Sequence, residues 1–173
     1  MKIDLDKLVE AFEWNSDSQQ HYFDKETGAV LMVTDDDRRV FERIEELRAN
    51  TDSDPKLSFE DALKEIDEPD WMIDSIVTVR PLLEDESGRY IVIPSLESRD
   101  GWRDMEAFIE TVEDERARDL LTVAISGPGS FRRFKDVLPR WPEERERWFK
   151  FQHARNLERV REWLECEEIE VGE

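Results

Sequence analysis

The sequence predicts an α+β fold that is mostly helical, with a small antiparallel β-sheet. Three observations lead to this class. Two β-prone runs flank a turn near the N-terminus, and a short run rich in β-branched residues, 90–93, ends at Pro94. About the last 75 residues carry apolar side chains at helical spacing. With 173 residues, 38% of them hydrophobic, the chain suits a single domain, 1–173, with an N-terminal subregion 1–55 and a helical core 90–170.

The first third of the chain combines two helices with a hairpin. Residues 4–14 place their apolar side chains on one helical face, with Asp4 as the expected N-cap. Residues 21–34 predict a hairpin with Gly28 near the end of its turn. Residues 35–50 predict a helix with an acidic first turn, where the helix dipole favours negative charge.

In the middle of the chain one segment has a clear secondary-structure prediction and another has an ambiguous one. The polar loop 50–57 suggests a boundary, and Ser58 with Asp61 resembles the capping box of a short helix. Residues 71–83 fit a strand through their branched side chains and a helix through their apolar spacing. Pro81 disturbs either structure, so the sequence leaves both open.

A short strand at 90–93 precedes four predicted helices. Ser98 is the expected N-cap of the first, Gly127 ends the second, and Ser130 is the expected N-cap of the third. Pro142 suits the first turn of the last helix, which is rich in aromatic residues. We expect this helix to pack on the first and third of the four, and the final seven residues to suit a short strand.

The chain is strongly acidic, with a formal net charge of −20. Its cations are 18 Arg and only 7 Lys, a balance typical of adaptation to high salt, where dense negative charge is screened. A mimic of nucleic acid that binds a basic partner is the alternative. A disordered acidic tail does not fit, because the acids are interleaved with apolar residues.

A soluble cytoplasmic protein is expected from the remaining bulk features. No apolar run approaches the roughly 18 residues of a membrane span, and the charged N-terminus does not resemble a secretory signal. The single cysteine, Cys166, excludes an internal disulfide framework and a cysteine-based zinc cluster within one chain.

The most distinctive stretch is a Gly-Pro-Gly turn followed by a cluster of cations. Backbone N–H groups at the start of a helix attract anions, and the cations directly behind this turn would lie on its solvent side. The candidate anion-binding residues are Gly127, Gly129, Ser130, Arg132, Arg133, Lys135 and Arg140. The stretch lacks the Lys-Ser/Thr ending of a phosphate-binding P-loop, so nucleotide hydrolysis is not indicated.

Charge counting supports a local asymmetry and leaves three interpretations open. Residues 131–163 hold ten Arg or Lys and six Asp or Glu, so this segment is +4 and the rest of the chain is −24. The cations either pair internally with carboxylates, bind an anion, nucleotide or nucleic acid, or contact a protein partner. Trp141 and Phe149 lie off the apolar stripe of the last helix and are candidates for a partner-contact surface.

Catalytic and metal signals are sparse. His21 and His153 are the only histidines, and they do not form a metal-binding pair by spacing. Asp35, Asp36 and Asp37 suit helix capping better than a hard cation. We therefore assign no catalytic residue, metal ligand or cofactor from the sequence.

Five strings between Tyr90 and Glu170 occur in a familiar order: "YIVIPS", "MEAFIETVED", "AISGPGSFRRFKDVL", "RERWFKF" and "EWLE". Together they resemble the bacterial uncharacterised protein family 0158, and the hairpin with its "D-x-x-TG" turn is similar to it more loosely. The family pattern has Ala where this chain has Ser130, and a polar or charged residue where it has Pro128, which removes one backbone N–H. The resemblance implies kinship and transfers no activity.

These observations favour a non-enzymatic binding or regulatory module with an anion-binding basic face. A protein–protein adaptor that uses the acidic surface is the first alternative, and an enzyme whose carboxylates cannot be located from spacing is the second. The partner would be an anionic ligand, a nucleic acid or an acidic protein, and not a membrane.

Overall fold

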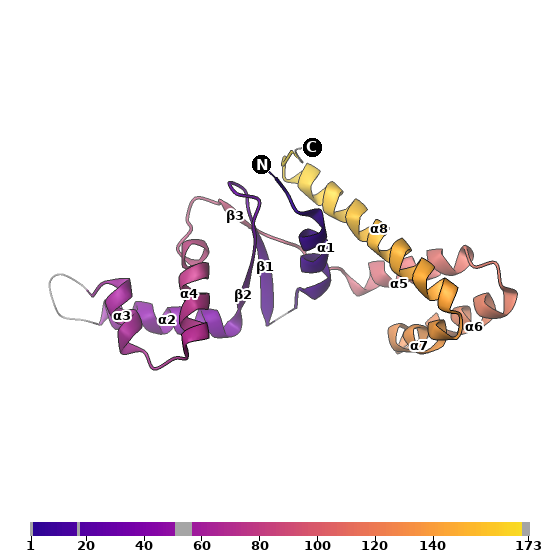
Figure 1. Cartoon of the computed structure of the whole chain (residues 1–173), viewed down its shortest axis with the longest axis horizontal. Coiled ribbons are helices and arrows are strands. Elements are labelled where there is room, and N and C mark those ends of the chain that lie inside the picture. Colours follow the sequence, from indigo (N-terminus) through magenta and orange to yellow (C-terminus); the bar gives the residue numbers. More distant parts are fainter. Residues whose placement is uncertain (1, 17, 51–56, 171–173) are drawn as a thin grey trace. The chain divides into compact units, whose positions relative to one another are not determined.

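A computed structural model describes residues 2–16, 18–50 and 57–170 (Figure 1). Within these ranges the chain forms eight α-helices, one 3-10 turn and a three-stranded antiparallel sheet, which confirms the α+β class. The chain divides into two compact units. The first is built mainly from residues 15–93, and the second from residues 5–14 together with the chain from Pro94 onward.

The sheet of the first unit has the strand order β2-β1-β3. Its strands are β1 (Gln19–Asp24), β2 (Val30–Thr34) and β3 (Tyr90–Val92). The hairpin turn between β1 and β2 contains Gly28 at a φ of 77°, a left-handed conformation that glycine adopts without strain. Tyr22 pairs with Leu31 on one side and with Val92 on the other, so the register of the central strand is set from both edges.

Three helices complete the first unit: α2 (Asp35–Ala49), α3 (Phe59–Glu65) and α4 (Asp70–Leu83). Thr34 is the N-cap of α2 and forms a capping box with Asp37, so of the three acids at this helix start Asp37 acts in capping. The ambiguous segment is a helix, α4, with Pro81 in its last turn. The helices and one face of the sheet enclose a core of Val33, Val40, Ile44, Phe59, Ala62, Ile66, Met72, Ile76, Val79 and Leu82.

All regular secondary structure in the described part of the second unit is helical. Its elements are α1 (Leu5–Trp14), α5 (Ser98–Glu110), α6 (Glu115–Ile125), α7 (Ser130–Val137), η1 (Leu138–Arg140) and α8 (Pro142–Cys166). Trp148 of α8 lies with its ring centroid 5.3 Å from that of Phe108 on α5 and 4.8 Å from that of Phe134 on α7. The predicted packing of the last helix is therefore confirmed.

Two predicted caps are wrong by one residue. The N-cap of α5 is Glu97, and Ser98 is already the first helical residue. The N-cap of α7 is Gly129, whose φ of 77° brings the chain into the helix directly, and Ser130 is buried in the first turn. A left-handed residue changes the direction of the chain within one position, which spacing alone does not reveal.

The last described residues differ from the prediction of a short strand. Residues 167–170 form a turn and an irregular segment after α8, with Glu168 at a φ of 57°. Residues 171–173 and most of the predicted loop 50–57 lie outside the described residues. None of the described helices combines the length and the apolar character needed to cross a membrane.

Candidate functional site

The Gly-Pro-Gly turn connects α6 to α7 through two left-handed glycines. Gly127 and Gly129 both have a φ of 77°, and a Cβ atom at either position would meet no atom within 4 Å. The requirement for glycine here is therefore conformational and does not come from crowding. The turn brings the C-terminal carbonyls of α6 close to the first turn of α7.

Arg133 uses its guanidinium within this turn. Its Nε donates to the carbonyl oxygen of Ala124 at 2.9 Å, and one terminal nitrogen donates to the carbonyls of Ser126 and of Gly127, the latter at 3.2 Å. These carbonyls lie at the negative end of α6, where a cation is stabilising. Arg133 therefore fastens α6 to α7.

The other candidates at the turn do not converge on one point. Arg132 is 89% exposed, and among the described residues it forms an ion pair with the Asp136 carboxylate, 3.8 Å away on the next turn. Ser130 is buried and therefore offers little surface to a ligand in solvent. The candidate anion-binding residues therefore do not form one site. Arg133 belongs to the turn between α6 and α7, and Lys135 belongs to a separate surface.

That surface is a groove of about 680 Å³ in the second unit. Its buried floor includes Leu138 and Trp148, and its walls include Phe131 and Phe149, which are 39% and 52% exposed. The lining residues are Glu13, Trp14, Leu96, Phe131, Lys135, Leu138, Pro139, Arg145, Trp148, Phe149 and Gln152. Lys135 and Phe149, two residues singled out by the sequence, come together here.

The groove carries cations that have no carboxylate partner. Within the described part of the chain, no acidic side chain lies within 4 Å of the cationic nitrogens of Lys135 or Arg145. The Arg145 guanidinium lies 5.2 Å from the ring centroid of Phe149, a cation–π contact that leaves its N–H groups available. The one acid of the lining, Glu13, accepts a hydrogen bond of 2.6 Å from buried Asn156.

Two further candidates lie close to this groove in sequence. Arg140 is exposed and forms no ion pair with the described residues. Trp141 is half-buried and packs against the core of the second unit, and its backbone N–H donates to the carbonyl of Leu138 at 3.0 Å. Of the two predicted contact aromatics, only Phe149 presents a large exposed surface.

A second polar cluster surrounds Asp104 on α5, whose side chain is only 2% exposed. Arg159 donates to both of its carboxylate oxygens, at 2.7 and 2.8 Å, and Arg155 donates to one of them at 3.2 Å. The bond to Asp104 raises the pKa of Arg159. A cleft of about 360 Å³ lies beside this cluster, but its arginines already have internal partners.

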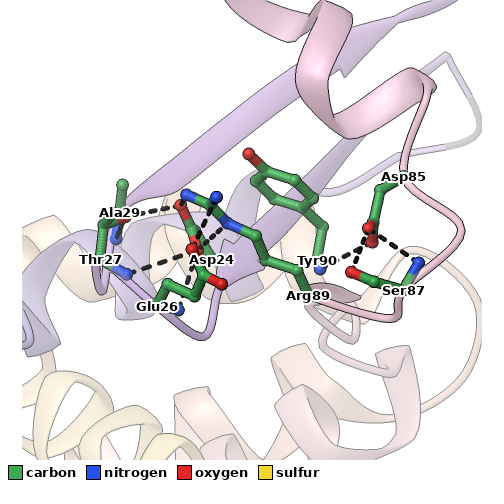
Figure 2. Close-up of polar contacts among 8 residues, drawn as sticks. All are labelled: Asp24, Glu26, Thr27, Ala29, Asp85, Ser87, Arg89 and Tyr90. Atoms are coloured by element: carbon green, nitrogen blue, oxygen red, sulfur yellow. Dashed lines mark hydrogen bonds and ion pairs between the residues drawn. The ribbon is translucent and has the colours of Figure 1, made fainter.

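A third cluster joins the hairpin turn to the segment before β3 (Figure 2). The buried Asp24 carboxylate accepts two hydrogen bonds from Arg89, at 2.8 and 2.6 Å, and one from the Thr27 hydroxyl at 2.7 Å. The Arg89 guanidinium, followed by the turn hydrogen bonds, holds the pKa of Asp24 well below its usual range. Every oxygen of this carboxylate is therefore used in holding the hairpin.

The histidines have local roles in the described structure. The His21 backbone N–H and its Nδ1 both lie 2.7 Å from Oδ1 of Asn15, and burial lowers the pKa of His21. The His153 Nε2 lies 3.4 Å from a carboxylate oxygen of Asp6. Among the residues that the structure describes, no group of three or more His, Cys, Asp or Glu side chains is arranged to hold a metal ion.

Comparison with known proteins identifies the relatives of the chain. The model of an uncharacterised protein family, UPF0158, matches residues 63–172. The chain belongs to the UPF0158 family. A curated UPF0158 protein of Pseudomonas aeruginosa is 26% identical over 170 residues, which cover 98% of this chain and 86% of that protein. No solved structure matches the chain.

Membership in UPF0158 confirms the resemblance seen in the C-terminal strings. The matched range contains α5 to α8, and therefore the helices that supply most of the groove. Three features were not found from the sequence: the contribution of Arg145, the Asp104 cluster and the pairing of Asp24 with Arg89. The last two join residues 55 and 65 positions apart, a separation that no local spacing pattern reveals.

Proposed function

We propose that this UPF0158 chain is a non-enzymatic binding module that holds an anionic group of its ligand or partner in the groove lined by α7 and α8. One observation carries the proposal. Lys135 and Arg145 line the same groove, and neither has a carboxylate within 4 Å among the described residues. Other cations of the chain, such as Arg116, also form no ion pair with the described residues, so the placement of these two in one groove is what supports the proposal.

The groove offers these cations a favourable environment for binding. Its aromatic walls exclude water on one side, which strengthens an ionic contact relative to one on open surface. The rest of the chain is strongly acidic, so a partner with many charges would be repelled at longer range. We therefore expect an interaction that depends on salt and is limited to a few negative groups.

Binding to simple anionic probes tests the proposal. The probes are a fluorescein-labelled oligoglutamate peptide of about 12 residues, a labelled oligothymidylate of about 12 nucleotides and tripolyphosphate. Fluorescence anisotropy measures the first two, and competition against them measures the third. At least one probe should bind the full chain, more tightly at about 50 mM than at about 200 mM NaCl.

The double variant Lys135→Glu/Arg145→Glu should weaken that binding about tenfold. Each exposed ionic contact contributes up to about 1 kcal/mol, and reversal replaces attraction by repulsion. Arg116→Glu is the matched control, because Arg116 is an exposed cation of the same unit without an ion pair among the described residues. An equal loss in both variants would mean that net charge, and not the groove, governs binding.

A further inference from the structure

We infer that the natural occupant of the groove is an acidic polypeptide segment with aromatic or aliphatic anchors. This inference rests on the proposed function and narrows its partner class. It depends on the chemistry of the groove floor, on the number of its cations and on the charge of the whole chain.

The lining of the groove favours a ligand with apolar groups. Phe131 and Phe149 are the exposed walls, and Leu138, Pro139 and Trp148 lie beneath and beside them. A ligand that offers only phosphate or carboxylate groups would leave these aromatic surfaces in water. A ligand with apolar side chains would cover them, and removal of apolar surface from water is the main source of affinity in such grooves.

The number of cations limits the charge of the occupant. Lys135 and Arg145 are the two basic residues of the lining, and Glu13 is the acidic one. A single-stranded nucleic acid carries one phosphate per nucleotide and is bound along a continuous basic track with stacked bases. Two cations on a chain of net charge −20 match two or three carboxylates better than such a repeating polyanion.

The shape of the groove also suits a peptide. Its volume of about 680 Å³ accommodates several side chains, and its lining comes from α7 and α8 together with η1, the end of α1 and Leu96. Amphipathic segments bind such grooves by placing anchors at i, i+3, i+4 and i+7. Here the anchors would contact the aromatic residues, and acidic side chains beside them would pair with Lys135 and Arg145.

Selection from a random peptide library tests this assignment directly. The library displays segments of about 16 residues, the target is the full chain, and enriched sequences are read before and after competition with free peptide. We expect enriched peptides to be acidic and to carry aromatic or aliphatic residues at helical spacing. One such peptide, synthesised with fluorescein, should bind about tenfold more weakly to Lys135→Glu/Arg145→Glu.

Separate variants test whether apolar contacts contribute to peptide binding. Phe149→Ser should weaken the same peptide about tenfold, whereas Val123→Ser should not, because Val123 is 69% exposed on α6 and does not line the groove. Replacing the apolar residues of the peptide by serine, at unchanged charge, should have an equal effect. Thermal unfolding of each variant shows that the loss does not come from unfolding.

The outcomes separate the two proposals. If the oligothymidylate binds more tightly than any selected peptide and remains sensitive to charge reversal, anion binding stands and the peptide partner is refuted. The peptide partner is also refuted if no peptide is enriched, or if the affinity of the enriched peptides changes neither with Lys135→Glu/Arg145→Glu nor with Phe149→Ser. If every anionic probe ignores the charge reversal, the proposed function fails as well. Selection of segments identical to parts of this chain would identify a second copy as the partner.

Discussion

Replacement of Asp24 by asparagine tests whether the hairpin depends on a buried charge. In the native chain the Asp24 carboxylate accepts two hydrogen bonds from Arg89 and one from Thr27, and its Oδ1 accepts the backbone N–H of Glu26 at 2.9 Å (Figure 2). Asparagine keeps one acceptor oxygen but places an NH₂ group against donors. The side chain of Asp24 is only 5% exposed, so water does not replace the lost bonds.

The expected loss is about 2–3 kcal/mol in the free energy of unfolding of the first unit. Breaking a fully buried ion pair costs about 3–5 kcal/mol. The Arg89 side chain is 31% exposed and also contacts Glu26 at 2.7 Å, so its charge stays partly compensated and the figure falls below that range. Urea unfolding followed by circular dichroism at pH 7 measures the loss.

The pH dependence provides a second, independent check. The pKa of Asp24 is lowered in the folded chain, so its stabilising contribution is fully present above the unfolded value of about 3.9 and is lost as the pH falls below it. The difference between native chain and variant should therefore narrow as the pH decreases from about 4 towards 2. A constant difference over that range, or a loss below about 0.5 kcal/mol at pH 7, would refute the assigned role.

Asp85→Asn is the matched control for this measurement. The Asp85 carboxylate accepts from the Ser87 hydroxyl at 2.6 Å and from the backbone N–H groups of Ser87 and Tyr90, at 3.0 and 3.2 Å (Figure 2). It forms no ion pair with the described residues. Its replacement should therefore cost about 0.5–1.5 kcal/mol, clearly less than that of Asp24.

Three further substitutions test the second unit. Arg133→Ala should lower the unfolding free energy by about 1–2 kcal/mol in urea, since three carbonyls lose their donor, while groove binding stays unchanged; a binding defect would contradict its separation from the groove. Asp104→Asn should cost about 3 kcal/mol in the same assay, because two arginines lose a buried partner, and a neutral result would disprove that the cluster is structural. Gly129→Ala should lower the melting temperature by several degrees, about 1 kcal/mol, through the left-handed φ alone, and an unchanged melting temperature would count against this.

The helices were predictable because their apolar periodicity is strong, and the exceptions have local causes. Residues 71–83 looked ambiguous because branched side chains suit strands, yet in α4 the buried Met72, Ile76 and Val79 follow helical spacing. Pro81 is tolerated there because only the last turn follows it. The sequence predicts the cap one residue late, at Ser130, because serine is a common N-cap, whereas the left-handed Gly129 enters the helix without a side-chain cap.

The candidate site was predictable only in part. Lys135 and Phe149 were selected because one follows the glycine turn and the other lies off the apolar stripe, and both line the groove. The position of Arg145 was not distinguishable among ten cations of residues 131–163. Arg133 was misleading for a physical reason: its partners are backbone carbonyls, which every residue carries and no sequence pattern marks.

The internal-pairing and anion-binding interpretations of the basic segment each account for different residues. Arg147 pairs with Glu144 within α8, whereas Arg155 and Arg159 pair with Asp104 and so join α8 to α5. Lys135, Arg140, Arg145 and Lys150 form no ion pair with the described residues.

The positions of the charged residues are more informative about a binding surface than the net charge of the chain. Acids outnumber bases 45 to 25, yet the absence of an ion pair does not by itself mark a site, because exposed cations outside the groove, such as Arg116, also form none with the described residues. Lys135 and Arg145 differ from other cations without an ion pair, such as Arg116, because both line one groove together with exposed aromatic residues. An excess of acids over the whole chain does not account for two cations without a carboxylate partner in a groove with exposed aromatic side chains. The partner that we propose, with negative and apolar groups, would cover both these cations and the exposed Phe149.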